Sequence, residues 1–176
     1  MKMCPVPLII ATTFVLAALA APADAQFSFG AQGAVITGVD DLSTILPGAP
    51  DLNNTFGLGA RVVFQAPVLP IGLVGQGTYY FPDADDYSYS TYSLAARFRL
   101  SLPLISPYGL GGWQWRRTST GGTSSTESGA MIGVGVELNL GVSLFLEGSY
   151  EFNEEVPGNP DFNNNPIVIK GGIMFG

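Results

Sequence analysis

Residues 55–65 read TFGLGARVVFQ, and this stretch alternates between two kinds of side chain. The even positions carry only apolar groups: Phe56, Leu58, Ala60, Val62 and Phe64. The odd positions are mostly small, polar or basic: Gly57, Gly59, Arg61, Val63 and Gln65. Because a β-strand sends successive side chains to opposite faces, the pattern predicts a strand with one apolar side and one mixed side.

The same two-sided pattern recurs down the chain and predicts about eight strands. Their expected spans are Phe27–Thr37, Thr55–Gln65, Ile71–Phe81, Thr91–Leu102, Pro107–Arg117, Ser128–Leu138, Val142–Phe152 and Pro166–Phe175. Each span is about ten or eleven residues, the length that a tilted strand needs to cross a bilayer. A change of parity at Gly111-Gly112 predicts a bulge in the fifth strand.

Long and short connections alternate between these strands. The long, polar ones are expected at Gly38–Asn54, Pro82–Ser90, Thr118–Glu127 and Asn153–Asn165. This alternation is typical of an all-β, single up-and-down antiparallel transmembrane barrel, with long loops outside and tight turns in the periplasm. The sheet is expected to close, because an open edge in lipid leaves backbone groups unpaired. The run Thr118–Thr126 is rich in Thr, Ser and Gly and is expected to be a floppy loop.

The first 25 residues have the pattern of a cleaved secretory signal peptide. Lys2 is followed by an apolar run, Leu8–Ala21, and small residues precede an expected cut before Gln26. The apolar run of about fourteen residues is shorter than the roughly 20 of a spanning helix. Residues 26–176 then form the barrel domain. The single cysteine, Cys4, leaves with the peptide, so no disulfide is expected.

The formal charge of −7 argues against a nucleic-acid partner, which requires a basic surface. Charged residues also fall on the mixed faces of the expected strands, where they would line the lumen. An ionic network is predicted there from Arg61, Arg97, Arg99, Glu137, Glu147, Glu151 and Lys170. Unpaired charges are costly in a narrow interior, so these groups should pair across the barrel. A structural plug is one interpretation; a small gated path for ions or solutes is the alternative.

The apolar faces favour lipid over water, although a secreted soluble lipocalin-like barrel is a second alternative. Eight strands leave a lumen that side chains only just fill, too small for all the large apolar groups. Aromatic residues are expected in two belts at the bilayer interfaces. The belt beside the long loops comprises Phe56, Tyr79, Phe81, Tyr92, Trp113, Trp115, Tyr150 and Phe152. The other belt comprises Phe27, Phe64, Tyr108 and Phe175.

Taken together, the chain resembles the small outer-membrane β-barrel proteins of Gram-negative bacteria, of the OmpA-transmembrane-domain or OmpX kind. At the C-terminus, Ile169, Gly171, Ile173 and Phe175 resemble the signal that the outer-membrane assembly machinery reads, although Gly176 follows the aromatic residue. The resemblance implies the bacterial outer membrane as location, with the lipid bilayer and lipopolysaccharide as surroundings. It implies a structural or surface-interaction role through the extracellular loops, with no ligand identified.

No enzymatic activity, cofactor or metal is expected. Outer-membrane barrels that are enzymes resemble one another in using a histidine, and this chain contains none. The acidic runs Asp83–Asp86 and Asn153–Glu155 offer oxygen ligands for a divalent cation. Their spacing matches no defined loop, so a solvated surface is the preferred interpretation.

Overall fold

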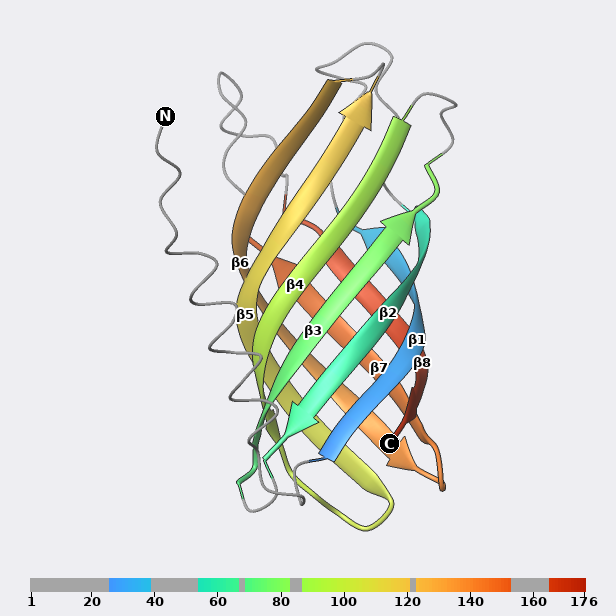
Figure 1. Ribbon diagram of the computed structural model, residues 1–176, viewed down its shortest axis with the longest axis vertical. Coiled ribbons are helices and arrows are strands. Elements are labelled where there is room, and N and C mark those ends of the chain that lie inside the picture. Colours follow the sequence, from blue (N-terminus) through green and yellow to red (C-terminus); the bar gives the residue numbers. More distant parts are fainter. Residues whose placement is uncertain (1–25, 39–53, 67–68, 83–86, 121–122, 153–164) are drawn as a thin grey trace, which may run out of the picture.

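Eight antiparallel strands make up most of the described structure, and short turns and connections make up the rest. This computed structural model describes residues 26–38, 54–66, 69–82, 87–120, 123–152 and 165–176. The strands are β1 (Gln26–Thr37), β2 (Phe56–Gln65), β3 (Ile71–Tyr80), β4 (Tyr87–Arg99), β5 (Ile105–Thr120), β6 (Thr123–Asn139), β7 (Ser143–Glu151) and β8 (Ile167–Phe175). Each pairs with the next, and β8 pairs with β1, which closes the barrel (Figure 1). The predicted up-and-down barrel of about eight strands is confirmed.

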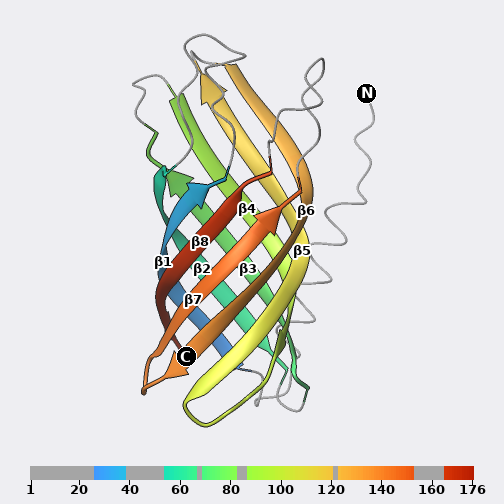
Figure 2. The same cartoon turned by 180° about the vertical axis from the view of Figure 1, so that it is seen from behind.

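The two ends of the barrel differ, as the loop lengths predict. We call the end where β1 finishes and β2 begins the long-loop end, and the opposite end the short-turn end. At the long-loop end, β4, β5 and β6 rise above the other strands, and the shorter β7, β8 and β1 stand side by side behind them (Figures 1 and 2). Among the described residues, no helix is long and apolar enough to span a membrane.

Three details of the prediction are wrong. β4 begins at Tyr87, so residues 87–90 of the expected loop Pro82–Ser90 belong to a strand. Instead of a floppy loop, β5 and β6 continue as a paired hairpin through Thr118↔Ser125 to Thr120↔Thr123. Threonine is β-branched and favours strands, which the loop-like composition concealed. The bulge at Gly111-Gly112 is also absent, because the register of β5 with both neighbouring strands is unbroken there.

The outer wall of the barrel carries the large apolar side chains. Leu58, Leu94 and Leu146 are each about half exposed, and Val134 is 71% exposed. Leu94, Val134 and Leu146 lie well inside their strands, where a water-soluble barrel would place polar groups. Burying each such side chain is worth roughly 1.5–3 kcal/mol, so this wall requires an apolar surrounding.

The inner wall combines apolar clusters with buried charges. One cluster lies towards the long-loop end and consists of Ala34, Ile36, Tyr80, Tyr89 and Val168. A second lies towards the short-turn end and consists of Val63, Val74, Phe145 and Met174. The third follows β4, β5 and β6 and consists of Ala95, Tyr108, Leu110 and Met131. The charged side chains lie between these clusters.

Candidate functional site: the ionic interior and its rims

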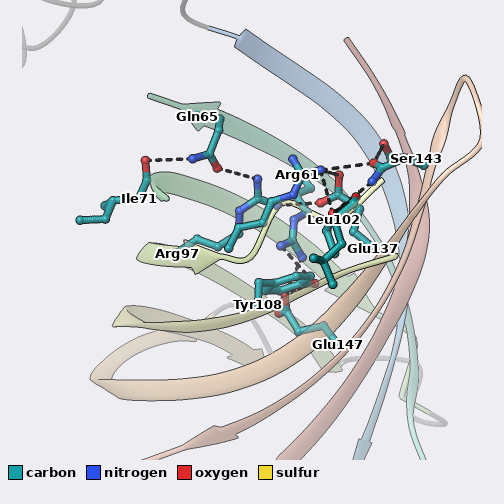
Figure 3. A network of polar contacts seen from close by, with 12 residues as sticks. Arg61, Gln65, Ile71, Arg97, Leu102, Tyr108, Glu137, Ser143 and Glu147 are labelled. Atoms are coloured by element: carbon teal, nitrogen blue, oxygen red, sulfur yellow. Dashed lines mark hydrogen bonds and ion pairs between the residues drawn. The ribbon is translucent and has the colours of Figure 1, made fainter. Parts of the chain in front are cut away.

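Glu147 is the carboxylate around which the first ionic group of the interior is built, and Figure 3 shows it beside Tyr108 and Arg61. Its Oε2 lies 2.6 Å from Arg61 Nη1 and accepts a hydrogen bond of 3.1 Å from the Tyr108 hydroxyl. Its Oε1 accepts a bond of 3.3 Å from Gln76 Nε2 and lies 3.7 Å from Lys170 Nζ. The carboxylate therefore has four polar partners, which come from β2, β3, β5 and β8. This degree of satisfaction is what makes a fully buried charge tolerable.

Aromatic rings complete the surroundings of the central arginine. The Arg61 guanidinium lies over the Phe145 ring, 4.4 Å from its centroid, and 5.6 Å from the centroid of Tyr108. The Arg97 guanidinium also approaches the Tyr108 ring and lies 5.4 Å from its centroid. Cation–π attraction is strongest where water is excluded, so the rings support the charges as well as fill space.

A second ionic group lies towards the short-turn end of the interior. Glu137 pairs with Arg97 at 2.9 Å and with Arg99 at 3.6 Å. Arg97 also donates to Gln65 Oε1 at 3.0 Å, and Arg99 donates to Ser106 at 3.2 Å. Asn139 and Ser143 extend the hydrogen bonds to the turn before β7. This network thus ties β2, β4, β5, β6 and β7 together at one rim.

A third group lies towards the long-loop end and is less complete. Arg116 Nη2 pairs with Glu127 Oε2 at 3.0 Å, and the Glu127 side chain is 60% exposed. Glu151 is buried and lies within electrostatic reach of Lys170 and Arg116. Its Oε2 has no hydrogen-bond partner among the described residues. The ionic interior is therefore tightest in the middle and at the short-turn end.

Little space remains between the first two groups. A cavity of about 10 Å³ is lined by Ser28, Arg61, Val63, Arg97, Glu137, Phe145 and Met174. A cavity must offer about 10–15 Å³ to hold a single water molecule. This cavity, beside Arg61, Arg97 and Glu137, thus has room for about one water molecule.

The structure places all seven residues of the predicted ionic network inside the barrel. Six of them, Arg61, Glu147, Lys170, Arg97, Arg99 and Glu137, form the first two groups. Glu151 is inside as well, but it makes no ion pair within 4.0 Å among the described residues. Arg116, Gln76 and Gln114 were missed. Strand parity would have found Arg116 and Gln114, since they alternate with the outward Trp113 and Trp115.

Eleven of the twelve predicted belt residues face outward, and one does not. Exposure is between 42% and 54% for Phe56, Tyr79, Phe81, Tyr92, Trp113, Trp115, Phe152, Phe27 and Phe175. Tyr150 and Phe64 are half-buried against aromatic neighbours on the same wall. The placement of Tyr108 in a lipid-facing belt is wrong, because this side chain is buried in the lumen. Gly135, its register partner on β6, leaves the space that the ring occupies.

Other predicted features lie outside the described residues: residues 1–25 and the acidic runs at 83–86 and 153–155. In the described part of the chain, no group of three or more acidic, His or Cys side chains is arranged to hold a metal ion. The residues of the expected assembly signal form the outward face of β8, with Ile169 and Phe175 exposed.

Comparison with known proteins agrees with this architecture. The family model of the outer membrane protein beta-barrel domain matches residues 8–175. The fold is similar to the N-terminal β-barrel domain of Pseudomonas aeruginosa OprF, with a TM-score of 0.56 and 13% identity over 86% of this chain and 99% of that one. It is also similar to Neisserial surface protein A, with a TM-score of 0.61 and 17% identity over 85% and 97% of the two chains. No curated protein sequence gives a match.

The chain therefore belongs to the outer membrane protein beta-barrel domain family, and its location is the bacterial outer membrane. The apolar outer wall faces the lipid bilayer. This excludes the alternative of a secreted, soluble lipocalin-like barrel.

Proposed function

We propose that the protein is a closed barrel that does not conduct, and that it acts through its long-loop end as a structural or surface-interaction protein. The observation that carries this proposal is the central carboxylate, Glu147, with its four buried polar partners. An ion that crosses the lumen has to displace these contacts, and the neighbouring cavity has room for about one water.

The energetic cost of opening supports a closed interior. Breaking a buried ion pair by removing one partner costs about 3–5 kcal/mol, and every 1.4 kcal/mol is about tenfold in an equilibrium. An open state that separates Arg61 from Glu147 at this cost would be populated in roughly one molecule in a hundred to one in several thousand. A small gated channel is the alternative, and it requires this separation to be much cheaper.

Conductance in planar bilayers tests the proposal. The refolded protein should give no discrete current steps, whereas a double variant, Arg61→Ala with Glu147→Ala, should leak because both side chains that fill the centre are shortened. A trimeric porin in the same bilayers verifies that steps are detectable. Discrete steps in the unmodified protein that change on Glu147→Gln would establish the gated channel instead.

Orientation is the second part of the proposal. Outer-membrane barrels keep short turns in the periplasm and place longer connections outside, so the long-loop end is assigned to the cell surface. A short epitope tag inserted between Thr120 and Thr123 should bind antibody on intact cells. Binding only after the outer membrane is permeabilised would reverse the orientation.

Export and assembly follow the same reasoning. We propose that residues 1–25 are removed, so that the mature protein begins at Gln26, which its intact mass would show. Phe175 and the alternating residues Ile169, Gly171 and Ile173 would be read by the assembly machinery. Phe175→Ala should then lower the amount of folded protein in cells more than it lowers refolding from urea in vitro.

The absence of histidine from the chain supports a role without catalysis.

A further inference from the structure

One cation of the described strands differs from all the others in its direction. Five of the six Lys and Arg residues that the structure describes lie on the inner wall: Arg61, Arg97, Arg99, Arg116 and Lys170. Arg117 is exposed on the outer wall. It makes no ion pair within 4.0 Å with any carboxylate in the described part of the chain. The carboxylate nearest in register, Glu127, lies on the opposite face and pairs with Arg116.

Hydroxyl groups surround Arg117 on this face of the β4–β5–β6 sheet. Its register partners are Ser90 on β4 and Thr126 on β6. The next outward row, away from the bilayer, is Ser88, Ser119 and Ser124. The row on the other side of Arg117 is Tyr92, Trp115 and Ser128, and below it stand Leu94, Trp113 and Ala130. The wall thus changes from apolar to aromatic to cationic and hydroxylic within a few residues.

The height of Arg117 matches the head-group layer of the membrane. From Ile105 to Trp115 the outward side chains of β5 are apolar or small, and ten residues of a strand tilted by about 40° rise roughly 25 Å. That is the height of the apolar band of an outer-membrane barrel. Arg117 lies two residues further, about 5 Å above Trp115 along the membrane normal. The head-group layer extends roughly 5–7 Å beyond the hydrocarbon on each side.

We propose that this surface, formed by Arg117, Ser90, Thr126 and the aromatic pair Trp115 and Tyr92, binds the phosphorylated sugar head group of an outer-leaflet glycolipid, lipopolysaccharide. The inference rests on the proposed orientation, which puts the long-loop end in the outer leaflet. Charge selects the occupant, because a guanidinium without an ion-pair partner among the described residues meets anionic head groups at this height. A soluble partner is not required to explain it.

The chemistry of the side chains fits this occupant. A guanidinium can donate two parallel hydrogen bonds to one phosphate, which an ammonium cannot do. The hydroxyls of Ser90 and Thr126 can donate to or accept from the sugar. Trp115 and Tyr92 present an apolar body to the acyl chains and a polar edge to the head group.

Tryptophan fluorescence gives a local test. The chain has only two tryptophans, Trp113 and Trp115, and both lie on this face below Arg117. The refolded mature protein in phosphatidylcholine nanodiscs would be titrated with diphosphoryl lipid A while Trp emission is followed. Arg117→Gln should raise the half-saturating concentration roughly tenfold, the effect of losing a charge-assisted contact. Arg117→Lys should recover only part of the affinity.

A matched control lies one residue away. Arg116→Gln removes the same charge from the inner wall and should leave the titration unchanged. Should that variant fail to fold, Arg99→Gln at the other rim serves the same purpose. Lipid A stripped of its phosphates should bind as weakly to the unmodified protein as diphosphoryl lipid A binds to Arg117→Gln.

Three results would overturn the proposal. Equal titrations for the unmodified protein and Arg117→Gln would show that Arg117 is not part of a lipid site. Equal binding of phosphate-free lipid A would show that phosphate is not recognised. Displacement of diphosphoryl lipid A by millimolar inorganic phosphate would show that the site binds free anions and not lipid. All three are independent of the conductance and epitope tests, so this proposal can fail while the closed, surface-exposed barrel stands.

Discussion

The inner and outer walls of the same strands are opposites. On β4, Arg97 points inward, is 3% exposed and pairs with Glu137, while Leu94 points outward and is 48% exposed. Residues a few positions apart on one strand therefore lie in two environments, an ionic interior and an apolar exterior. A water-soluble protein shows the reverse arrangement. In this barrel, a buried side chain is one that points into the lumen, and it can be charged. The medium around the barrel, hydrocarbon instead of water, determines which side chains are stable on the outer wall.

Removing the central carboxylate should have the largest effect. Glu147→Ala leaves Arg61 and Lys170 buried without their partner, and is expected to lower the free energy of unfolding by about 3–5 kcal/mol. The measurement is urea unfolding in phospholipid vesicles, followed by Trp emission and by the mobility of unboiled samples. Glu127→Ala is the matched control, because the Glu127 side chain is 60% exposed and should cost about 1 kcal/mol or less. Equal losses in the two variants would contradict the ionic core.

A charge on the outer wall should have the next largest effect. Val134 lies about halfway between Ser128, the register partner of Trp115, and Leu138, the register partner of Ile105. It is 71% exposed, so Val134→Arg is expected to cost about 2–4 kcal/mol at the bilayer midplane. In the same unfolding assay Val134→Leu should be nearly neutral. If the arginine were tolerated like a surface substitution, Val134 would not face hydrocarbon.

The fit of Tyr108 offers a smaller effect. A Cβ at Gly135 would collide with the Tyr108 ring and hydroxyl, so Gly135→Ala should cost about 1–3 kcal/mol, as overpacking does. Gly148, on the outer wall of β7, has nothing within 4 Å of a Cβ position. Gly148→Ala should therefore change the unfolding free energy by less than about 0.5 kcal/mol. An indifferent Gly135→Ala would mean that Tyr108 does not occupy the lumen.

Substitutions in the β5–β6 hairpin, above the bilayer, should have the smallest effect on stability. Ser124 is exposed, and its register partner across the hairpin is Ser119. Ser124→Ala should change the free energy of unfolding by no more than about 0.5 kcal/mol. A larger loss would indicate that this end packs against another part of the chain.

The number of strands, the closure of the barrel and the apolar or polar character of each wall could be predicted from the sequence. They follow from side chains that alternate in character along a strand, and this alternation is visible among neighbouring residues. The contrast of Phe56, Leu58 and Val62 with Gly57, Gly59 and Arg61 requires no knowledge of distant residues. Seven charged residues could be assigned to the lumen in the same way. The extension of β5 and β6 was missed because Thr and Ser suit both exposed strands and loops, so composition alone does not distinguish them.

Pairing within the lumen could not be predicted from the sequence. Which cation meets Glu147 depends on strand stagger around a closed barrel, and Arg61 and Glu147 are 86 residues apart. Tyr108 was misplaced because an aromatic ring near a strand end suits both a belt and a lumen. The space opposite it, left by Gly135, decides the matter and lies on another strand. Hydrogen bonding of its hydroxyl to Glu147 then makes the interior position stable.

Side-chain direction on β4 is the most direct test of the account. Ser93 and Leu94 are neighbours, and the register partners of Ser93 are Gln76 and Gln114 of the inner wall. Nitroxide labels would be placed at Ser93→Cys and Leu94→Cys in the refolded chain 26–176, which has no other cysteine. The label at residue 94 should collide readily with oxygen dissolved in lipid and hardly with a water-soluble nickel chelate, while the label at residue 93 should be immobilised and reached by neither. A label at residue 94 that is hidden from oxygen, with one at residue 93 that meets the nickel chelate, would contradict the account.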